Sequence, residues 1–385
     1  MAQPLTLQIL ERLIGFDTTS CNSNLALMEY VQNFLQKHGV SSQLVYDEDE
    51  KKANLYATIG PEDKSGIMLS GHTDTVPVAG QNWTKQAHQL SEQDGRYYGR
   101  GTSDMKGFLA VVLAYVPQMV NRKLHTPIHL AFSYDEEIGC VGVRRLIHTM
   151  KNHRIKPAAC IIGEPTSMKV VTAHKGKLAA RVTVRGKECH SGMAPQGVNA
   201  INYASRLIVW LEELAKIKQQ VGPFDHSYDI PHSTVHTGTI EGGSALNIVP
   251  NYCSFLFEIR NIAGDDPWLI FNNFKLQVDK LEAEMKKIDD GCNIEITITT
   301  EYPGLDTAEH TDVVKFVRYL AKSAESANIN FGTEGGLFSN ELKIPTVVCG
   351  PGSMEQGHKP DEFIHVSQLE FCEEFMTRLC DELSG

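Results

Sequence analysis

The chain has 385 residues, of which 42% are hydrophobic and 22% are charged, and its formal net charge is -11 at pH 7. This length exceeds what one hydrophobic core usually supports, so we expect two domains, and the composition excludes a disordered or fibrous protein. The acidic charge disfavours nucleic acid and anionic membranes, because both are bound by a basic face, and leaves a small molecule as the expected partner.

The cysteines and the N-terminal segment indicate a cytoplasmic protein. The nine cysteines are scattered from Cys21 to Cys380 without a C-x-x-C pair, which predicts reduced thiols and neither a disulfide framework nor a cysteine zinc site. Residues 1–10 lack a basic segment followed by an apolar run, and the most apolar stretch, 108–116, is too short to span a bilayer. We therefore expect no targeting signal and no membrane partner.

The first part of the chain alternates between helical and strand patterns. Apolar residues recur at helical spacing over 28–35 and 108–115. Three short runs, 67–70, 128–134 and 158–162, are apolar enough to be buried strands. Together they predict an α/β sheet covered by helices on both faces.

From about residue 177 the pattern changes to βαββαβ, which is ferredoxin-like. Its elements are expected at 178–185 (strand), 200–218 (helix), 233–240 and 253–260 (strands), 267–287 (helix) and 294–300 (strand).

The C-terminal part of the chain again alternates between helix and strand patterns. A helix is expected over 313–327, a buried strand over 345–350 and a helix over 366–383. The simplest arrangement is an insertion. Residues 1–177 and 302–385 would form the larger domain, and residues 178–301 would form a second domain inserted into it.

Acidic residues and histidines follow the predicted strands, and open α/β sheets bind ligands at the carboxyl ends of their strands. His72 and Asp74 come after the strand at 67–70, as suits a metal-binding histidine whose second ring nitrogen is held by a carboxylate or another nearby acceptor. By itself this pair also fits a surface turn.

Asp104 lies in the run GRGTSDMKG at 99–107, just before a predicted helix. A phosphate-binding loop is the rival interpretation, but G-x-G-x-x-G requires glycine where Asp104 stands, and the Gly-Lys-Ser/Thr of a Walker A motif is missing. Asp104 could also simply cap the helix.

Three further positions complete the series. Asp135, Glu136 and Glu137 follow the strand at 128–134, either as a solvated acidic cluster or with one glutamate on a metal and the other facing the water that attacks. Glu164 follows the next strand, where Pro165 keeps its backbone extended, although an ordinary turn fits too. His358 lies in a Gly/Pro-rich segment after the strand that ends at Gly350; alone, such a histidine is more often structural.

Five such acidic or histidine positions in one chain are jointly improbable as accidents. Two histidines and three carboxylates supply what a two-metal site with one bridging acid requires.

Five motifs resemble those of the M20 metallopeptidase and deacylase family: GHTDTVP at 71–77, GRGTSDMKG at 99–107, DEE at 135–137, GEPT at 163–166 and GHKPDE at 357–362. The resemblance spans the chain. It implies a zinc-dependent exopeptidase-like α/β catalytic domain, an inserted lid and dimerisation domain, a homodimer, and two Zn²⁺ per subunit, with Co²⁺ or Mn²⁺ as substitutes.

Residue by residue, the resemblance implies one zinc ion on His72 and Glu164, a second on Glu137 and His358, and Asp104 bridging both. Asp74 would orient His72, and Glu136 would be the general base.

The resemblance also implies substrate-binding positions in the inserted domain. His190 matches a histidine that reaches the neighbouring subunit's site and donates to the oxyanion, although Gly192 replaces a serine common in the family. Asn247 and Arg260 match positions that hold the substrate carboxylate; for Arg260 a strand-end salt bridge is the alternative.

The runs at 173–176, 331–338 and 350–356 are most similar to family members that release acetate from N-acetyl-L-ornithine in arginine biosynthesis. Within them, Glu334 could accept the cationic amine of ornithine. Succinyl-diaminopimelate or a broad range of N-acylamino acids are alternative substrates. A non-catalytic metal-binding protein is a remoter alternative, disfavoured because Glu136 and all five ligand positions occur together.

Overall fold

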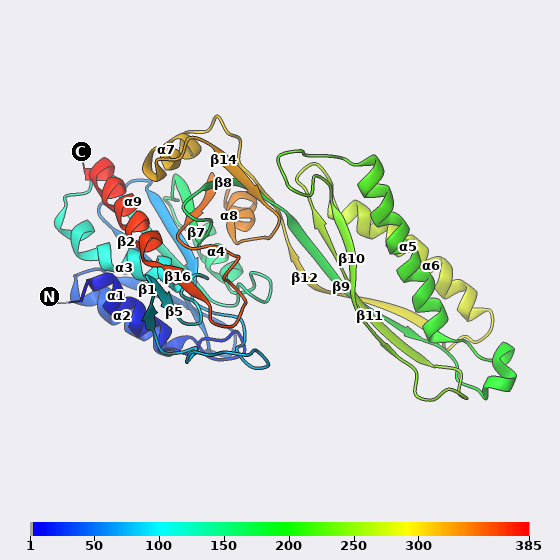
Figure 1. Cartoon of the computed structure of the whole chain (residues 1–385). Coiled ribbons are helices and arrows are strands. Elements are labelled where there is room, and N and C mark those ends of the chain that lie inside the picture. Colours follow the sequence, from blue (N-terminus) through cyan, green and yellow to red (C-terminus); the bar gives the residue numbers. More distant parts are fainter. Residues whose placement is uncertain (1–2, 385) are drawn as a thin grey trace. The chain divides into compact units, whose positions relative to one another are not determined.

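The computed structural model describes residues 3–384, and the chain divides into two compact units. The larger unit contains Met1–Ala173, Leu305–Asn328 and Thr333–Gly385, and the inserted unit contains His174–Gly304 and Ile329–Gly332. The elements of both units can be followed in Figure 1.

A nine-stranded mixed sheet forms the centre of the larger unit. Its middle strands β6, β3, β7 and β15 are parallel, so their carboxyl ends meet at one edge. The full order is β1 (Ser42–Tyr46), β2 (Ala53–Ile59), β6 (Ile128–Ser133), β3 (Ile67–His72), β7 (Ala159–Pro165), β15 (Thr346–Gly350), β8 (Val170–His174) and β13 (Leu305–Asp306), with β14 (Ser326–Ile329) paired to β8.

Helices pack against this sheet on both sides. Five helices share one hydrophobic core with alternate strand residues such as Leu69 and Ile161: α1 (Leu5–Ile14), α2 (Leu25–Lys37), α3 (Lys106–Asn121), α7 (Asp312–Ala321) and α9 (Val366–Ser384). The neighbouring strand residues point the other way. There α4 (Val143–Lys151) and α8 (Gly335–Leu342) contact each other and the sheet, which confirms the predicted α/β class.

A small three-stranded sheet joins distant segments of the larger unit. It consists of β4 (Ser91–Gln93), β5 (Arg96–Tyr98) and β16 (Phe363–His365), in the order β16-β5-β4. Because Phe363 pairs with Tyr98, the C-terminal segment lies directly beside the loop that follows β5.

The inserted unit has the predicted ferredoxin-like βαββαβ order. Its elements are β9 (Gly176–Arg185), α5 (Ala200–Val221), β10 (Thr234–Gly242), β11 (Tyr252–Asn261), α6 (Pro267–Lys286) and β12 (Asn293–Tyr302), and the sheet order is β10-β11-β9-β12. Side chains of Asn199 and Asp266 cap the starts of α5 and α6. The unit has a core of its own, which includes Phe255, Phe257 and Phe274.

The helix predicted over 313–327 is wrong at its end. α7 stops at Ala321, Lys322 is left-handed with φ of 51°, and Ser326 already begins β14. Pairing with β8 determines the conformation of this segment despite its helix-forming residues. No helix among residues 3–384 is long and apolar enough to cross a membrane.

Candidate metal centre

The carboxyl ends of the central parallel strands bring the predicted ligands together. His72 is the last residue of β3, Glu164 lies near the end of β7, and Glu136 and Glu137 follow β6. His358 follows β15 after a turn, with a left-handed φ of 61°. Parallel strands end at the same edge, so these side chains meet there.

Asp104 lies between the two histidines and directs one carboxylate oxygen at each. Its Oδ1 is 3.1 Å from His72 Nε2, and its Oδ2 is 3.2 Å from His358 Nε2. His72 Nε2 also lies 3.6 Å from Glu164 Oε1, and His358 Nε2 lies 2.9 Å from Glu137 Oε2. The helix-capping alternative for Asp104 is wrong, because α3 begins at Lys106 without a side-chain cap.

The orientation of His72 is set mainly by a backbone group. Its Nδ1 lies 2.9 Å from the carbonyl oxygen of Asp74, whereas the Asp74 carboxylate is 3.5 Å away. An N–H donated to that carbonyl leaves the lone pair of Nε2 facing Asp104 and Glu164, as a metal ligand requires.

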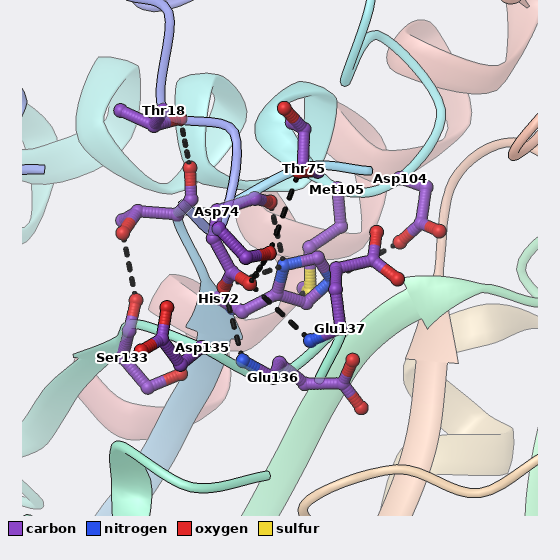
Figure 2. A network of polar contacts seen from close by, with 12 residues as sticks. Thr18, His72, Asp74, Thr75, Asp104, Met105, Ser133, Asp135, Glu136 and Glu137 are labelled. Carbon is purple, nitrogen blue, oxygen red and sulfur yellow. Dashed lines mark hydrogen bonds and ion pairs between the residues drawn. The ribbon is translucent and has the colours of Figure 1, made fainter. Parts of the chain in front are cut away.

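The Asp74 carboxylate instead fixes the turn that carries the DEE motif, as Figure 2 shows. It accepts the backbone N–H of Glu136 at 3.1 Å and that of Glu137 at 3.2 Å. The hydroxyl of Ser20 donates to it at 2.8 Å. One buried acid therefore positions both glutamates.

The DEE motif is not a solvated cluster, so that alternative is wrong. Asp135 is buried and forms an ion pair with Lys52 at 2.6 Å. The side chain of Glu137 is only 7% exposed, and Glu136 is half-buried as a whole residue. The thiol of Cys140 donates to Glu136 Oε1 at 3.4 Å. Each of the three acids thus has a separate environment.

Electrostatics favour cations at this site. Burial and the neighbouring carboxylates raise the pKa of Glu136 and Glu164 well above the usual range, and burial and Asp104 raise the pKa of Glu137 to about 7. Burial lowers the pKa of His72, but Glu164 and Asp104 raise it more. A crowd of buried acids is costly unless positive charge balances it.

The donor set fits divalent metal ions. Ligand atoms of His72, Glu136 and Glu164, and those of His72, Asp104 and Glu137, lie within 4.8 Å of one another. Mixed nitrogen and oxygen donors suit Zn²⁺, Co²⁺ or Mn²⁺. A carboxylate with one oxygen toward each of two histidines has the arrangement expected of a bridging ligand.

Comparison with known proteins identifies the family. Residues 68–382 match the sequence profile of peptidase family M20/M25/M40. The chain belongs to this family. It is therefore a metal-dependent hydrolase, and the resemblance seen in its motifs is confirmed.

Two relatives of this M20 protein are named acetylornithine deacetylase. That of Pasteurella multocida (strain Pm70) is 33% identical over 387 residues, covering 98% of this chain and 97% of its own. That of Myxococcus xanthus is 32% identical over 381 residues, with coverage of 98% and 97%. The fold is similar to that of the M20 family metallo-carboxypeptidase of Sulfolobus solfataricus, with a TM-score of 0.80, 19% identity, and coverage of 100% and 99%.

The inserted unit of this M20 protein brings His190 and Asn247 into adjacent loops. His190 forms a β-bridge with Ile248, and the backbone N–H of Ser191 donates to the Asn247 carbonyl at 2.9 Å. The exposed His190 ring accepts the Gly192 N–H at Nδ1, at 3.1 Å, so the neutral ring carries its proton on Nε2.

Arg260 has intramolecular partners in this unit. Its Nε lies 3.2 Å from Glu258 Oε1, and its Nη1 donates to the Tyr302 hydroxyl at 2.8 Å. The strand-end salt bridge considered for Arg260 is therefore present, and its carboxylate-binding role stays a prediction.

Glu334 is buried in the larger unit, immediately before α8, with only 1% of its surface exposed. Burial raises its pKa to about 7, and the hydroxyls of Ser133 and Ser70 oppose that rise. A substrate amine can meet this carboxylate only through a pocket that reaches below the surface, and the binding of that amine by Glu334 stays a prediction.

Two pairs of residues that support the site were not predicted from the sequence. Ser20 and Lys52, which hold Asp74 and Asp135, lie in segments without a motif. Arg100 and Glu362 contact the Asp104 loop and do lie within two of the quoted motifs. Only Arg100 and Glu362 could have been found from the sequence, because they lie within motifs.

Proposed function

We propose that this protein hydrolyses N-acetyl-L-ornithine to L-ornithine and acetate, a step of arginine biosynthesis in the cytoplasm. The observation that carries the proposal is the Asp104 carboxylate, which faces His72 with one oxygen and His358 with the other, beside Glu136. The full-length relatives named acetylornithine deacetylase support the substrate.

Two divalent ions, with zinc as the proposed metal, would be held by the converging side chains. His72 and Glu164 would hold one, His358 and Glu137 the other, and Asp104 both. When bound, such ions polarise the amide carbonyl and raise the acidity of the attacking water.

Glu136 would be the general base. Its carboxylate takes a proton from the water as the water oxygen attacks the acetyl carbon, and returns that proton to the amide nitrogen as the C–N bond breaks. Acetic acid and the free amine result, and the acid then passes its proton to the amine, so that acetate and the ammonium form of ornithine account for both protons of the water. Asp74 fixes the backbone of Glu136 for this role, and Cys140 donates to its side chain.

The inserted unit would complete the substrate site. His190 would donate its Nε2–H to the oxyanion of a neighbouring copy in a homodimer, and Asn247 and Arg260 would hold the substrate carboxylate. Glu334 would accept the side-chain amine of ornithine.

A turnover assay of the zinc-loaded protein on three substrates tests the proposal. We expect N-acetyl-L-ornithine to be hydrolysed with the highest kcat/KM, ahead of N-succinyl-diaminopimelate and N-acetyl-methionine. Preference for either competitor would overturn the substrate and retain the hydrolase, and no turnover on any would overturn both.

A further inference from the structure

A buried ion pair lies beside the proposed metal centre without a role in the steps above. Arg100 Nη1 and Glu362 Oε2 are 2.8 Å apart, and both side chains are only 1% exposed. Burying two charges is unfavourable unless their remaining hydrogen-bonding groups are also used, so the other contacts of the pair are informative.

The Glu362 carboxylate binds the backbone of the loop that carries Asp104. Its Oε1 accepts the N–H of Ser103 at 2.8 Å and that of Asp104 at 3.0 Å. Its Oε2 accepts the N–H of Gly101 at 2.9 Å in addition to the Arg100 guanidinium. Four donors thus converge on one carboxylate and leave the loop little freedom.

Glu362 belongs to the same short segment as His358, which lies four residues before it. Glu362 therefore holds the backbone of Asp104, while the side chain of Asp104 faces His358. The segment is fixed in turn, because Gly99 donates to the Glu362 carbonyl at 2.9 Å and Phe363 pairs with Tyr98.

Gln81 connects the guanidinium to His358. Arg100 Nη2 donates to Gln81 Oε1 at 2.5 Å, and Gln81 Nε2 donates to the His358 carbonyl at 2.9 Å. The guanidinium also lies 4.9 Å from the centre of the Trp83 ring. A closed chain of contacts thus runs from Asp104 through Glu362, Arg100 and Gln81 to His358.

We propose that Gln81, Arg100 and Glu362 are positioning residues that set the separation of Asp104 and His358 before metal binds. In the metal-free protein the neighbouring carboxylates of Glu137 and Glu164 repel that of Asp104, and without a fixed backbone this repulsion would move Asp104 away from its position beside His358. Ligands held in place bind metal more tightly because less order has to be imposed on binding. The inference rests on the proposed metal centre.

The proposal predicts different effects at the two metal positions. Glu362→Gln keeps the size of the side chain but weakens the hold on Asp104, which both positions share, so both affinities should fall about 10- to 100-fold. Gln81→Ala removes the donor to the His358 carbonyl and one acceptor of the Arg100 guanidinium, but it leaves all four donors on the Glu362 carboxylate. The affinity of the position that includes His358 should therefore fall, and that of the other position should stay within about twofold.

The experiment is calorimetric titration of Zn²⁺ into the metal-free protein, repeated with Co²⁺ to record the absorption spectrum of each position. Asp265→Asn is the matched control, because it breaks a largely buried ion pair with Lys218, 2.7 Å long, in the inserted unit. This control should lower the thermal stability and leave both metal affinities unchanged.

The outcomes separate the inference from the proposed function. If the wild type binds no metal, the proposed function fails and the inference with it. If the wild type binds two ions and Glu362→Gln binds them equally well, with only the stability loss of the control, the network is merely structural and the inference is overturned. If Glu362→Gln does not fold, Gln81→Ala decides: selective weakening of one position supports the inference, and unchanged binding overturns it.

Discussion

The carboxylate of Asp74 accepts a hydrogen bond from the backbone N–H of Glu136 at 3.1 Å. Its second oxygen accepts the N–H of Glu137 at 3.2 Å. Asp74, the residue predicted to orient His72, makes its closest contact with that ring through its backbone carbonyl, at 2.9 Å. One residue links the histidine at the end of β3 to both glutamates after β6.

Replacing Asp74 by asparagine should disturb Glu136 without emptying the centre of metal. The amide keeps one acceptor oxygen but turns an NH₂ toward the other backbone N–H, so we expect kcat to fall about 10- to 100-fold at saturating metal. Ser20→Ala removes only the supporting hydroxyl and should cost less. Steady-state kinetics decide, and an unchanged kcat for Asp74→Asn would refute the positioning role.

Glu136→Gln should abolish most turnover and retain metal. The amide is of equal size but cannot take a proton from water, so kcat should fall by about 10² to 10⁴. Glu137→Gln is the contrasting variant, because its carboxylate lies 2.9 Å from His358 Nε2, and it should lose metal instead. Metal analysis beside each rate separates the two roles. Substantial activity of Glu136→Gln would mean that another group is the base.

His190→Ala should lower kcat with little effect on stability, because the side chain is exposed. Loss of one donor to an oxyanion typically reduces kcat by about 10² to 10³, with a smaller change in KM. His226→Ala, another exposed histidine of the inserted unit, is the control and should behave as wild type. Equal kinetics for both variants would remove His190 from the reaction.

The ligand positions were accessible to sequence reasoning because they follow strands. Once 67–70, 128–134 and 158–162 are recognised as buried strands, the convergence of His72, Glu137 and Glu164 follows from the geometry of a parallel sheet. The contacts that hold these residues follow no period. Glu362 reaches the backbone of Asp104 across 258 positions of the chain, and local patterns carry no information about such contacts.

Acid should destabilise the fold through two buried histidines, His129 in the larger unit and His174 in the inserted unit. Burial lowers the pKa of each to about 4, from an ordinary value of 6.5. Between these values the unfolded chain binds protons that the folded chain excludes. The contribution of these two histidines to the free energy of unfolding is therefore fully present above pH 6.5, and it is lost as the pH falls toward 4.

Each histidine should account for about 2 kcal/mol of lost stability between pH 7 and pH 5. Urea unfolding at several pH values measures the slope, and His129→Gln should reduce it. The Nδ1 of His129 lies 3.0 Å from the hydroxyls of Tyr56 and Thr58, so glutamine keeps a polar partner for them. The same slope in this variant would show that His129 titrates normally.

Glu334→Gln tests the proposed recognition of the ornithine amine. Loss of the negative charge should reduce kcat/KM for N-acetyl-L-ornithine about 10-fold or more relative to N-acetyl-methionine, which has no amine to pair. The ratio of the two values is the readout, since a general effect on the buried site lowers both. An unchanged ratio would assign Glu334 a structural role beneath the centre.

The central claim is hydrolysis that depends on two metal ions sharing Asp104. The most direct measurement adds Zn²⁺ stepwise to the metal-free protein while following both bound metal and turnover of N-acetyl-L-ornithine. We predict that binding saturates at two ions per chain, that turnover appears with them, and that Asp104→Ala loses both. Full turnover in the metal-free protein, or in Asp104→Ala, would contradict the account.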